Sequence, residues 1–161
     1  MTRPINAVLW ELIIVIVVAI GFTILCNALI ALTGVGVGKP TQIVPQGWEW
    51  VDRIVGFVWI GLLTALGIAW WLLRQAEANG IETPSRLLPI LFAVCLLYPF
   101  TFGLTPLSGL IGNVVIGAFA AWVAWKAYSL SVLAAILITP IAIWLSIATV
   151  YLYLLLRVNW S

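Results

Sequence analysis

The sequence predicts an all-α membrane protein that crosses the bilayer about five times. Hydrophobic residues make up 65% of the 161 residues and charged residues only 7%, and the mean hydropathy is +1.22. A soluble domain of this size needs far more polar surface, whereas a bilayer accommodates apolar surface. Five apolar runs meet the requirement of roughly 20 residues for a spanning helix, the third only barely. Together these observations predict a five-transmembrane-helix bundle.

The first predicted helix covers about residues 5–32. The run is far longer than the core of a signal peptide, and no clear cleavage site follows it, so we interpret it as a spanning helix. Glycines and prolines punctuate residues 33–50, which we expect to form a long loop. The second helix covers about residues 51–73, and a polar connection that contains Asn79-Gly80 and Pro84 follows it.

The third predicted helix, about residues 87–104, contains Pro89 and Pro99. Prolines are tolerated inside a membrane bundle because neighbouring helices satisfy the freed carbonyl groups. Thr105-Pro106 predicts a tight turn before the fourth helix, at about residues 107–127. The fifth helix covers about residues 132–156 and ends at Arg157. We therefore expect residues 1–161 to form a single transmembrane domain.

The composition argues against metal, nucleic-acid and ordinary catalytic sites. Histidine, the commonest metal ligand and general base, does not occur in the chain. A net charge of +2 offers no basic face for nucleic acid. Cys26 and Cys95 lie inside apolar runs, so we expect small buried hydrophobic residues rather than a disulfide or a zinc site. We therefore expect no catalytic residue, no metal and no cofactor, and a protein that is not an enzyme.

Ten tryptophans are the least usual feature of the sequence. Eight fall near predicted membrane boundaries, where a ring with an apolar body and a polar N–H is favoured. Trp10, Trp70, Trp71, Trp122 and Trp125 lie near one boundary, and Trp48, Trp50 and Trp160 lie near the other. Trp59 and Trp144 lie deeper, Trp59 at roughly 12 Å into its span.

Two interpretations of the deep tryptophans stay open. Tight core packing with a backbone carbonyl as acceptor would satisfy each indole N–H, and so would a bound ligand. Ala148 lies one turn beyond Trp144 on the same helix face, and a large aromatic side chain beside a small one can leave a hollow. Ser146 and Thr149 add hydroxyl groups nearby.

Three segments match the motifs of a known family in the correct order. The second-helix motif is matched by Trp48, Val58, Trp59, Leu62, Gly67 and Ala69, and the end of the third helix by Pro99, Phe102, Gly103 and Leu104. The fifth-helix motif is matched by Pro140, Trp144, Ser146, Ala148, Thr149, Arg157 and Asn159. On these residues the chain resembles the translocator protein / tryptophan-rich sensory protein family (TspO/MBR).

The resemblance implies a ligand pocket. Members of the family bind porphyrins, sterols and synthetic aromatic molecules between helices at the side of the first loop. By resemblance, the ligand-binding residues here would be Trp48, Trp59, Val94, Leu97, Phe102, Trp144, Ala148 and Thr149. Residues 33–50 would form the lid, and Lys39 or Arg53 could meet porphyrin carboxylates at the rim. A homodimer in a bacterial membrane is also expected.

Several family positions have lost a hydrogen-bonding group in this chain. Val94 and Leu97 stand where the family has Asn and Trp, and Ile60 and Leu63 stand where it has Thr and Tyr. Polar ligand groups buried in such a pocket would stay unpaired, which is unfavourable. We therefore interpret the chain as a divergent member with a more apolar ligand.

Two weaker patterns have ordinary explanations. Val150, Tyr153 and Arg157 match a permissive pattern proposed for sterol contact, but an interfacial tyrosine and a snorkelling arginine explain the same residues and are favoured. Asn27 and Asn113 are polar residues within spans, and we expect them to join helices by hydrogen bonds rather than to bind a ligand.

The sequence leaves three functional hypotheses. The first is a membrane receptor or carrier for a flat hydrophobic ligand, such as a tetrapyrrole, a sterol or an isoprenoid-like molecule. The second is a structural or assembly subunit of a larger membrane complex. The third, which the family resemblance suggests, is light-dependent porphyrin breakdown. The expected partners are an apolar ligand, the lipid bilayer and either a second copy or a larger complex, without nucleic acid.

Overall fold

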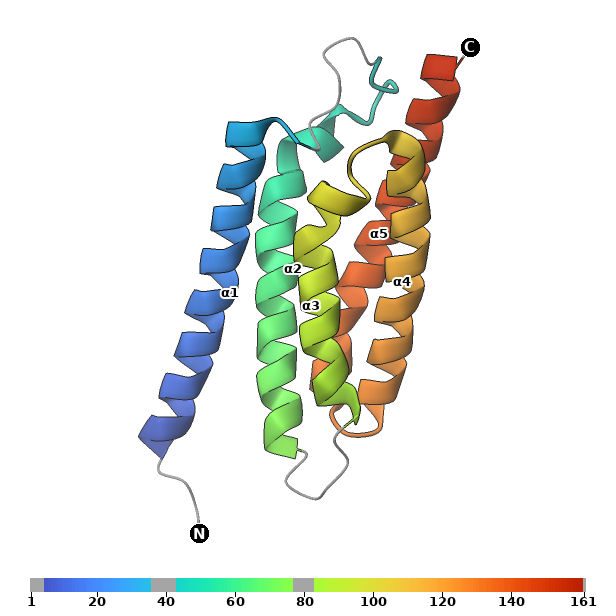
Figure 1. Cartoon of the computed structure of the whole chain (residues 1–161). Helices are drawn as coiled ribbons and strands as arrows, with labels where there is room; N and C mark the ends of the chain where they lie inside the picture. The colour runs from blue at the N-terminus through green and yellow to red at the C-terminus, as the bar shows by residue number, and fades with distance from the viewer. Residues whose placement is uncertain (1–4, 36–42, 77–82, 161) are drawn as a thin grey trace.

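Five long helices make up almost all of the structure (Figure 1). The computed structural model describes residues 5–35, 43–76 and 83–160. Its helices are α1 (Ile5–Thr33), α2 (Glu49–Ala76), α3 (Thr83–Thr101), α4 (Pro106–Tyr128) and α5 (Val132–Trp160). All five are long and apolar enough to cross a membrane, and the described part of the chain contains no strand. The predicted all-α, five-helix membrane fold is confirmed.

The third and fifth helices differ most from their predicted boundaries. α3 begins and ends three to four residues before the predicted range of 87–104. Its start at Thr83-Pro84 fits the preference for proline in the first turn. Its end is set by the amides of Phe102 and Gly103, which both donate to the carbonyl of Tyr98. α5 continues past Arg157 to Trp160.

The predicted turn at Thr105-Pro106 is the capped start of α4. The Thr105 hydroxyl accepts from the Ser108 amide at 3.1 Å, and the Thr105 amide donates back to the Ser108 hydroxyl at 3.1 Å. This reciprocal pair is a capping box, and Pro106 follows at the first helical position. The α3–α4 connection is therefore short and well satisfied within the chain.

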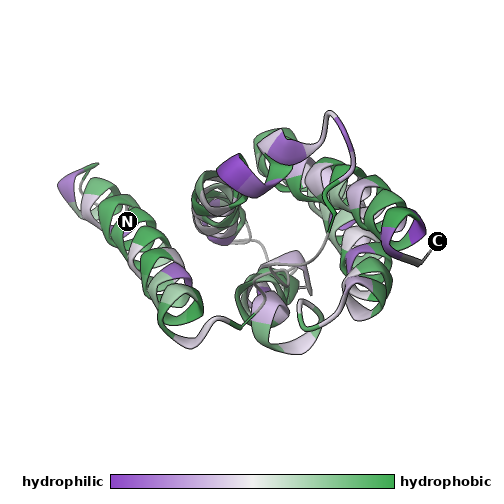
Figure 2. Cartoon of the chain, turned by 90° about the horizontal axis from the view of Figure 1, so that it is seen from above, coloured by the Kyte–Doolittle hydropathy of each residue, from purple (hydrophilic) through white to green (hydrophobic). Residues whose placement is uncertain are grey.

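α2, α3, α4 and α5 pack around a shared core, and α1 lies outside this group (Figures 1 and 2). The core is filled by fully buried aliphatic side chains, among them Leu63, Leu66, Leu91, Ile116 and Ile138. α1 buries only Ala19, Thr23 and Cys26. It approaches α2 at Gly67, where an added Cβ would lie 3.1 Å from Val15. The bundle is thus a four-helix core with one peripheral helix.

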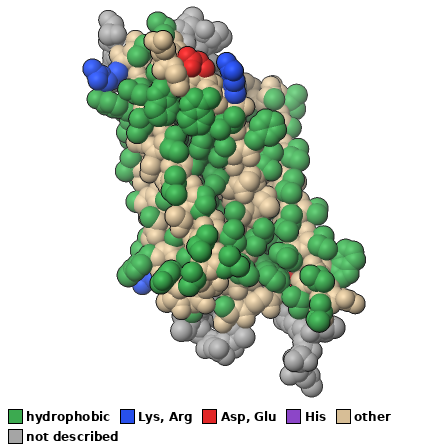
Figure 3. Space-filling model, turned by 180° about the vertical axis from the view of Figure 1, so that it is seen from behind, with side chains coloured by type: hydrophobic (Ala, Val, Ile, Leu, Met, Phe, Trp, Pro, Cys, Tyr) green, Lys and Arg blue, Asp and Glu red, His purple; other side chains and the backbone are tan. Residues whose placement is uncertain are grey.

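The surface between the two ends of the bundle is apolar (Figure 3). Lys, Arg, Asp and Glu side chains on this face gather at the ends, and hydrophobic side chains cover the middle. Large hydrophobic residues such as Ile14, Phe57 and Val114 are exposed on the helices. Such a surface suits lipid, because the helices satisfy their own backbone polar groups.

The boundary tryptophans fall into two groups. Trp10, Trp122 and Trp125 are exposed, as expected for residues at a membrane boundary. Trp71 differs from these three, because its indole nitrogen is buried and has no hydrogen-bond partner among the described residues. The side chain of Trp160 lies outside the described part of the structure.

Candidate functional site

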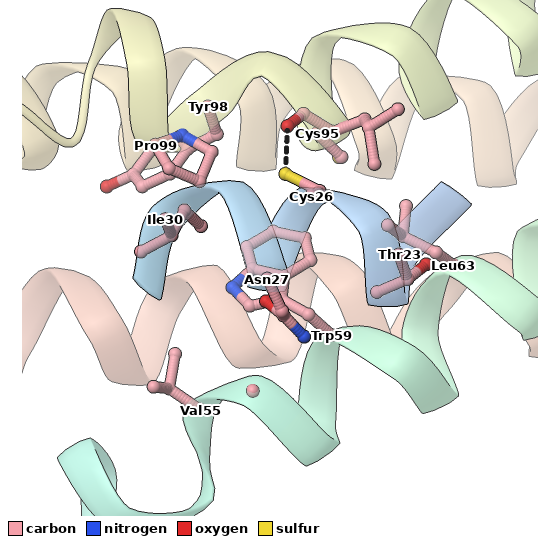
Figure 4. Close-up of a pocket in the computed structure, with 12 residues that line it drawn as sticks. Thr23, Cys26, Asn27, Ile30, Val55, Trp59, Leu63, Cys95, Tyr98 and Pro99 are labelled. Atoms are coloured by element: carbon pink, nitrogen blue, oxygen red, sulfur yellow. Dashed lines mark hydrogen bonds between the residues drawn. The ribbon is translucent and has the colours of Figure 1, made fainter. Parts of the chain in front are cut away.

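An apolar pocket of about 200 Å³ lies between α1, α2 and α3 (Figure 4). Four residues from each helix line it: Thr23, Cys26, Asn27 and Ile30 from α1, Val55, Gly56, Trp59 and Leu63 from α2, and Cys95, Leu96, Tyr98 and Pro99 from α3. These residues belong to the halves of their helices nearer the first loop, except Leu63, which lies at the middle of α2. None of them carries a charge.

Helical spacing explains why these residues meet. Thr23, Cys26, Asn27 and Ile30 follow the i, i+3, i+4, i+7 pattern that places side chains on one face of a helix. Val55, Gly56, Trp59 and Leu63 repeat this type of spacing on α2. Gly56 keeps part of the pocket open, because a Cβ at this position would meet only the Asn27 amide nitrogen, at 3.8 Å.

The wall that faces α4 is aromatic and firmly held. The ring centroids of Trp59 and Tyr98 are 6.2 Å apart, and those of Tyr98 and Phe102 are 6.3 Å apart. The Tyr98 hydroxyl donates to the carbonyl of Gly109 at 3.1 Å. Phe102 packs so closely on α4 that a Cβ on Gly112 would lie 2.5 Å from it. This wall is therefore anchored to the four-helix core.

The wall formed by α1 is joined to α2 and α3 by side-chain hydrogen bonds. The Cys26 thiol donates to the carbonyl of Leu96 at 3.2 Å, which links α1 to α3. Gln75 donates to Glu11 at 3.4 Å near the far end of α1. Cys26 and Cys95 are buried free thiols, as expected from the sequence, and both line the pocket. One side of the pocket thus depends on a helix with little buried surface.

The hydrogen-bonding groups of the pocket differ in whether a described residue pairs with them. The Thr23 hydroxyl donates to Ala19 and that of Tyr98 donates to Gly109, so both are satisfied. The Asn27 amide and the Trp59 indole N–H make no hydrogen bond to any described residue. The prediction that Asn27 and Asn113 join helices is wrong, because Asn113 Nδ2 is also buried without a partner in the described structure.

The two deep tryptophans lie at the same depth in the bundle but in different surroundings. Tyr151 of α5 donates to both carboxylate oxygens of Asp52 in α2 at 2.9 Å, which fixes the register of these antiparallel helices. Trp59 comes seven residues after Asp52, and Trp144 comes seven residues before Tyr151, so both lie on the same side of this hydrogen bond. Trp59 lines the pocket, whereas Trp144 is 7% exposed and belongs to the four-helix core.

The other predicted ligand residues lie outside the pocket lining. Trp48 stacks between Trp50 and Tyr151, with a centroid distance of 6.2 Å to each ring. Val94 packs against the core, and Leu97 is 53% exposed. Ala148 and Thr149 are half-buried on α5, and the Thr149 hydroxyl donates to the Leu145 carbonyl at 2.7 Å. Phe102 supports the pocket wall through Tyr98 without lining the pocket itself.

The residues of the sterol-contact pattern share an exposed face of α5. Val150, Tyr153 and Arg157 are all exposed, so this face is available to lipid. Arg53 is exposed near the start of α2, and Lys39 lies outside the described residues. Neither the pattern nor Arg53 contributes to the pocket lining.

Sequence reasoning missed Asn27, Cys26 and Tyr98 as pocket residues. A signal was present for Asn27, because a polar residue shares one face of a very apolar helix with Thr23 and Cys26. Tyr98 gave no such signal, since its place in the pocket depends on the packing of α3 against α2 and α4.

Comparison with known proteins finds no family model that matches this chain and no curated protein that matches it.

Proposed function

We propose that this protein is a membrane receptor or carrier that binds a flat apolar molecule between α1, α2 and α3. The single observation that carries the proposal is that Trp59, deep in its helix, lines an apolar pocket and that its indole N–H has no partner among the described residues. A core tryptophan usually has a hydrogen-bond partner when it is buried. Trp59 instead presents its ring and its polar group to open space that a ligand can fill.

The size of the pocket favours a small or narrow ligand. Pockets for drug-sized molecules usually measure about 300–1,000 Å³, and this one measures about 200 Å³. One substituted ring or a segment of an isoprenoid chain fits this volume. A whole tetrapyrrole requires α1 to move outward, which the small buried surface of that helix would permit.

The chemistry of the lining points to an uncharged ligand. Burial of a carboxylate without a positive partner is strongly unfavourable, and none of the pocket-lining side chains is charged. Porphyrin carboxylates would have to reach a residue outside the pocket, such as Arg53. Among the ligands that the sequence suggested, isoprenoid-like molecules therefore agree best with the lining.

The resemblance to the translocator protein family supports the same proposal. The family binds its ligands between helices at the first-loop side, and this pocket lies in the corresponding half of the bundle. The proposal therefore includes a location in a bacterial membrane and assembly as a homodimer. Trp144 and Ala148, which the resemblance suggested as ligand contacts, have no part in it, because neither lines the pocket.

A pair of glycine substitutions on α2 tests the proposal. Gly56→Leu adds a side chain to the pocket, whereas Gly61→Leu adds one on the same helix where a Cβ meets nothing within 4 Å. After gentle extraction, mass spectrometry of the wild type and of Gly61→Leu should detect an apolar molecule that Gly56→Leu has lost. Identical small-molecule contents in all three proteins would contradict binding at this site. A stoichiometric protein partner with an empty pocket would instead support an assembly subunit.

A further inference from the structure

We propose that the pocket selects an uncharged ligand with a hydrogen-bond acceptor, such as a ring carbonyl of a quinone, and that Asn27 and Trp59 donate to it. This inference rests on the proposed function, since it names the chemistry of the ligand at the same site. It starts from the two pocket groups that have no partner in the described structure, the Asn27 amide and the Trp59 indole N–H.

The two donors lie close together. A Cβ built on Gly56 would be 3.8 Å from Asn27 Nδ2, so the amide lies over α2 at this residue. Trp59 is three residues further along α2, which places it on the same helix face as Gly56. Figure 4 shows the Asn27 and Trp59 side chains together between α1 and α2. One acceptor atom of a ligand can therefore approach both groups.

The type of these groups determines what they recognise. An indole nitrogen is only a donor, whereas the Asn27 side chain offers NH₂ donors and a carbonyl acceptor. A ligand without an acceptor leaves both groups unpaired in an apolar environment, which costs binding free energy. A charged acceptor is disfavoured because the lining provides no counter-charge. A neutral carbonyl group meets both requirements.

Size and shape agree with a single ring. A fully substituted benzoquinone is a flat ring and is small enough for about 200 Å³. Val55 lines the pocket and is also exposed at the surface of α2, so an apolar tail can leave the pocket along this side. The pocket therefore fits a ring that carries carbonyl groups and an aliphatic tail.

A matched pair of small molecules tests the inference. Duroquinone and durene share a ring with four methyl groups, and only duroquinone has carbonyl groups. Because duroquinone has no free ring position, the thiols of Cys26 and Cys95 have no ring hydrogen to displace. Apparent dissociation constants come from the unfolding midpoint as a function of ligand concentration in nanodiscs. The wild type is expected to bind duroquinone about three- to tenfold more tightly than durene.

Two variants test whether Asn27 and Trp59 cause the preference for duroquinone over durene. Asn27→Leu keeps the approximate volume and removes the amide, and Trp59→Phe keeps a ring and removes the N–H, so each should reduce the preference. Asn113→Leu removes an unpartnered buried amide outside the pocket and should leave the preference unchanged. Equal binding of both molecules by the wild type, or an unchanged preference in both donor variants, would overturn the inference alone. Failure of both molecules to bind the wild type would overturn the proposed function as well.

Discussion

At the scale of single residues, depth in the membrane and role in the site are different properties. Trp59 and Trp144 lie at the same depth, and yet one lines a pocket and the other fills the core. Depth follows from sequence position at 1.5 Å per residue, whereas the direction of a side chain depends on how its helix is rotated against its neighbours. The sequence could therefore identify both residues as unusual without distinguishing their roles.

The two tryptophans should respond differently to the same substitution. Trp144→Phe removes buried ring atoms from the four-helix core and should lower the free energy of unfolding by about 1–2 kcal/mol. Trp59→Phe should change stability less, because Trp59 lies beside open space, and should weaken duroquinone binding. Denaturation in mixed micelles and ligand titration measure the two effects. An equal loss of stability in both variants would contradict the assignment of Trp59 to a pocket.

Gly112 shows how closely α3 and α4 pack. Its added Cβ would lie 2.5 Å from both Cβ and Cγ of Phe102, and atoms so near the Phe102 backbone cannot move aside easily. Gly112→Ala should therefore destabilise the protein by about 1–3 kcal/mol. Gly61→Ala is the matched control, because its Cβ meets nothing, and it should not destabilise the helix. Thermal unfolding of the two variants provides the comparison.

At the scale of elements, the end of α5 holds the first loop. The Asn159 side chain accepts from the Ile43 amide at 2.9 Å and donates to the Ile43 carbonyl at 3.0 Å. Nearby, Tyr151 donates to Asp52 and stacks on Trp48. These contacts join residues that are about a hundred positions apart in sequence. They attach the described part of the loop before α2, residues 43–48, to the four-helix core.

Removal of the Asn159 amide should release this loop locally. Asn159→Leu leaves the Ile43 amide without its side-chain acceptor, so hydrogen exchange at residues 43–48 should become faster. Exchange in the middle of α4 and α5 should not change, because those helices pack through buried apolar residues. Mass-spectrometric hydrogen exchange resolves the two regions. Unchanged exchange at residues 43–48 would show that Trp48 and Val51 hold the loop without Asn159.

The sequence predicted the five helices more accurately than the way in which they pack against one another. Composition and run length determine whether a helix can cross a bilayer, so five helices could be expected from the sequence alone. The start of α3 was placed too late, because the first turn at Thr83-Pro84 is polar although it belongs to the helix. The pocket itself was not predictable in detail, since it depends on where α1 crosses α2 and α3.

At the scale of the whole molecule, the bundle consists of a four-helix core and a peripheral α1. Because α1 forms one wall of the pocket, that wall can move without disrupting the core. Gly67→Leu should test this division, because its Cβ would lie 3.1 Å from Val15 and 3.4 Å from Ala19 on α1. The larger side chain should displace α1 and weaken ligand binding. The stability of α2–α5, measured by hydrogen exchange, should change little. Loss of protection throughout α4 and α5 would show that α1 is part of the core.

The position of α1 also determines whether the aqueous or the membrane concentration of a ligand would govern the occupancy of the pocket. A molecule that enters the proposed pocket beside Val55 would arrive sideways from the acyl chains, and it would not need to dissolve in the aqueous phase. Occupancy then follows the mole fraction of that molecule among the lipids, so diluting it with extra phospholipid at constant total amount empties the pocket. If the proposed function is correct, such a protein would respond to the composition of its own membrane.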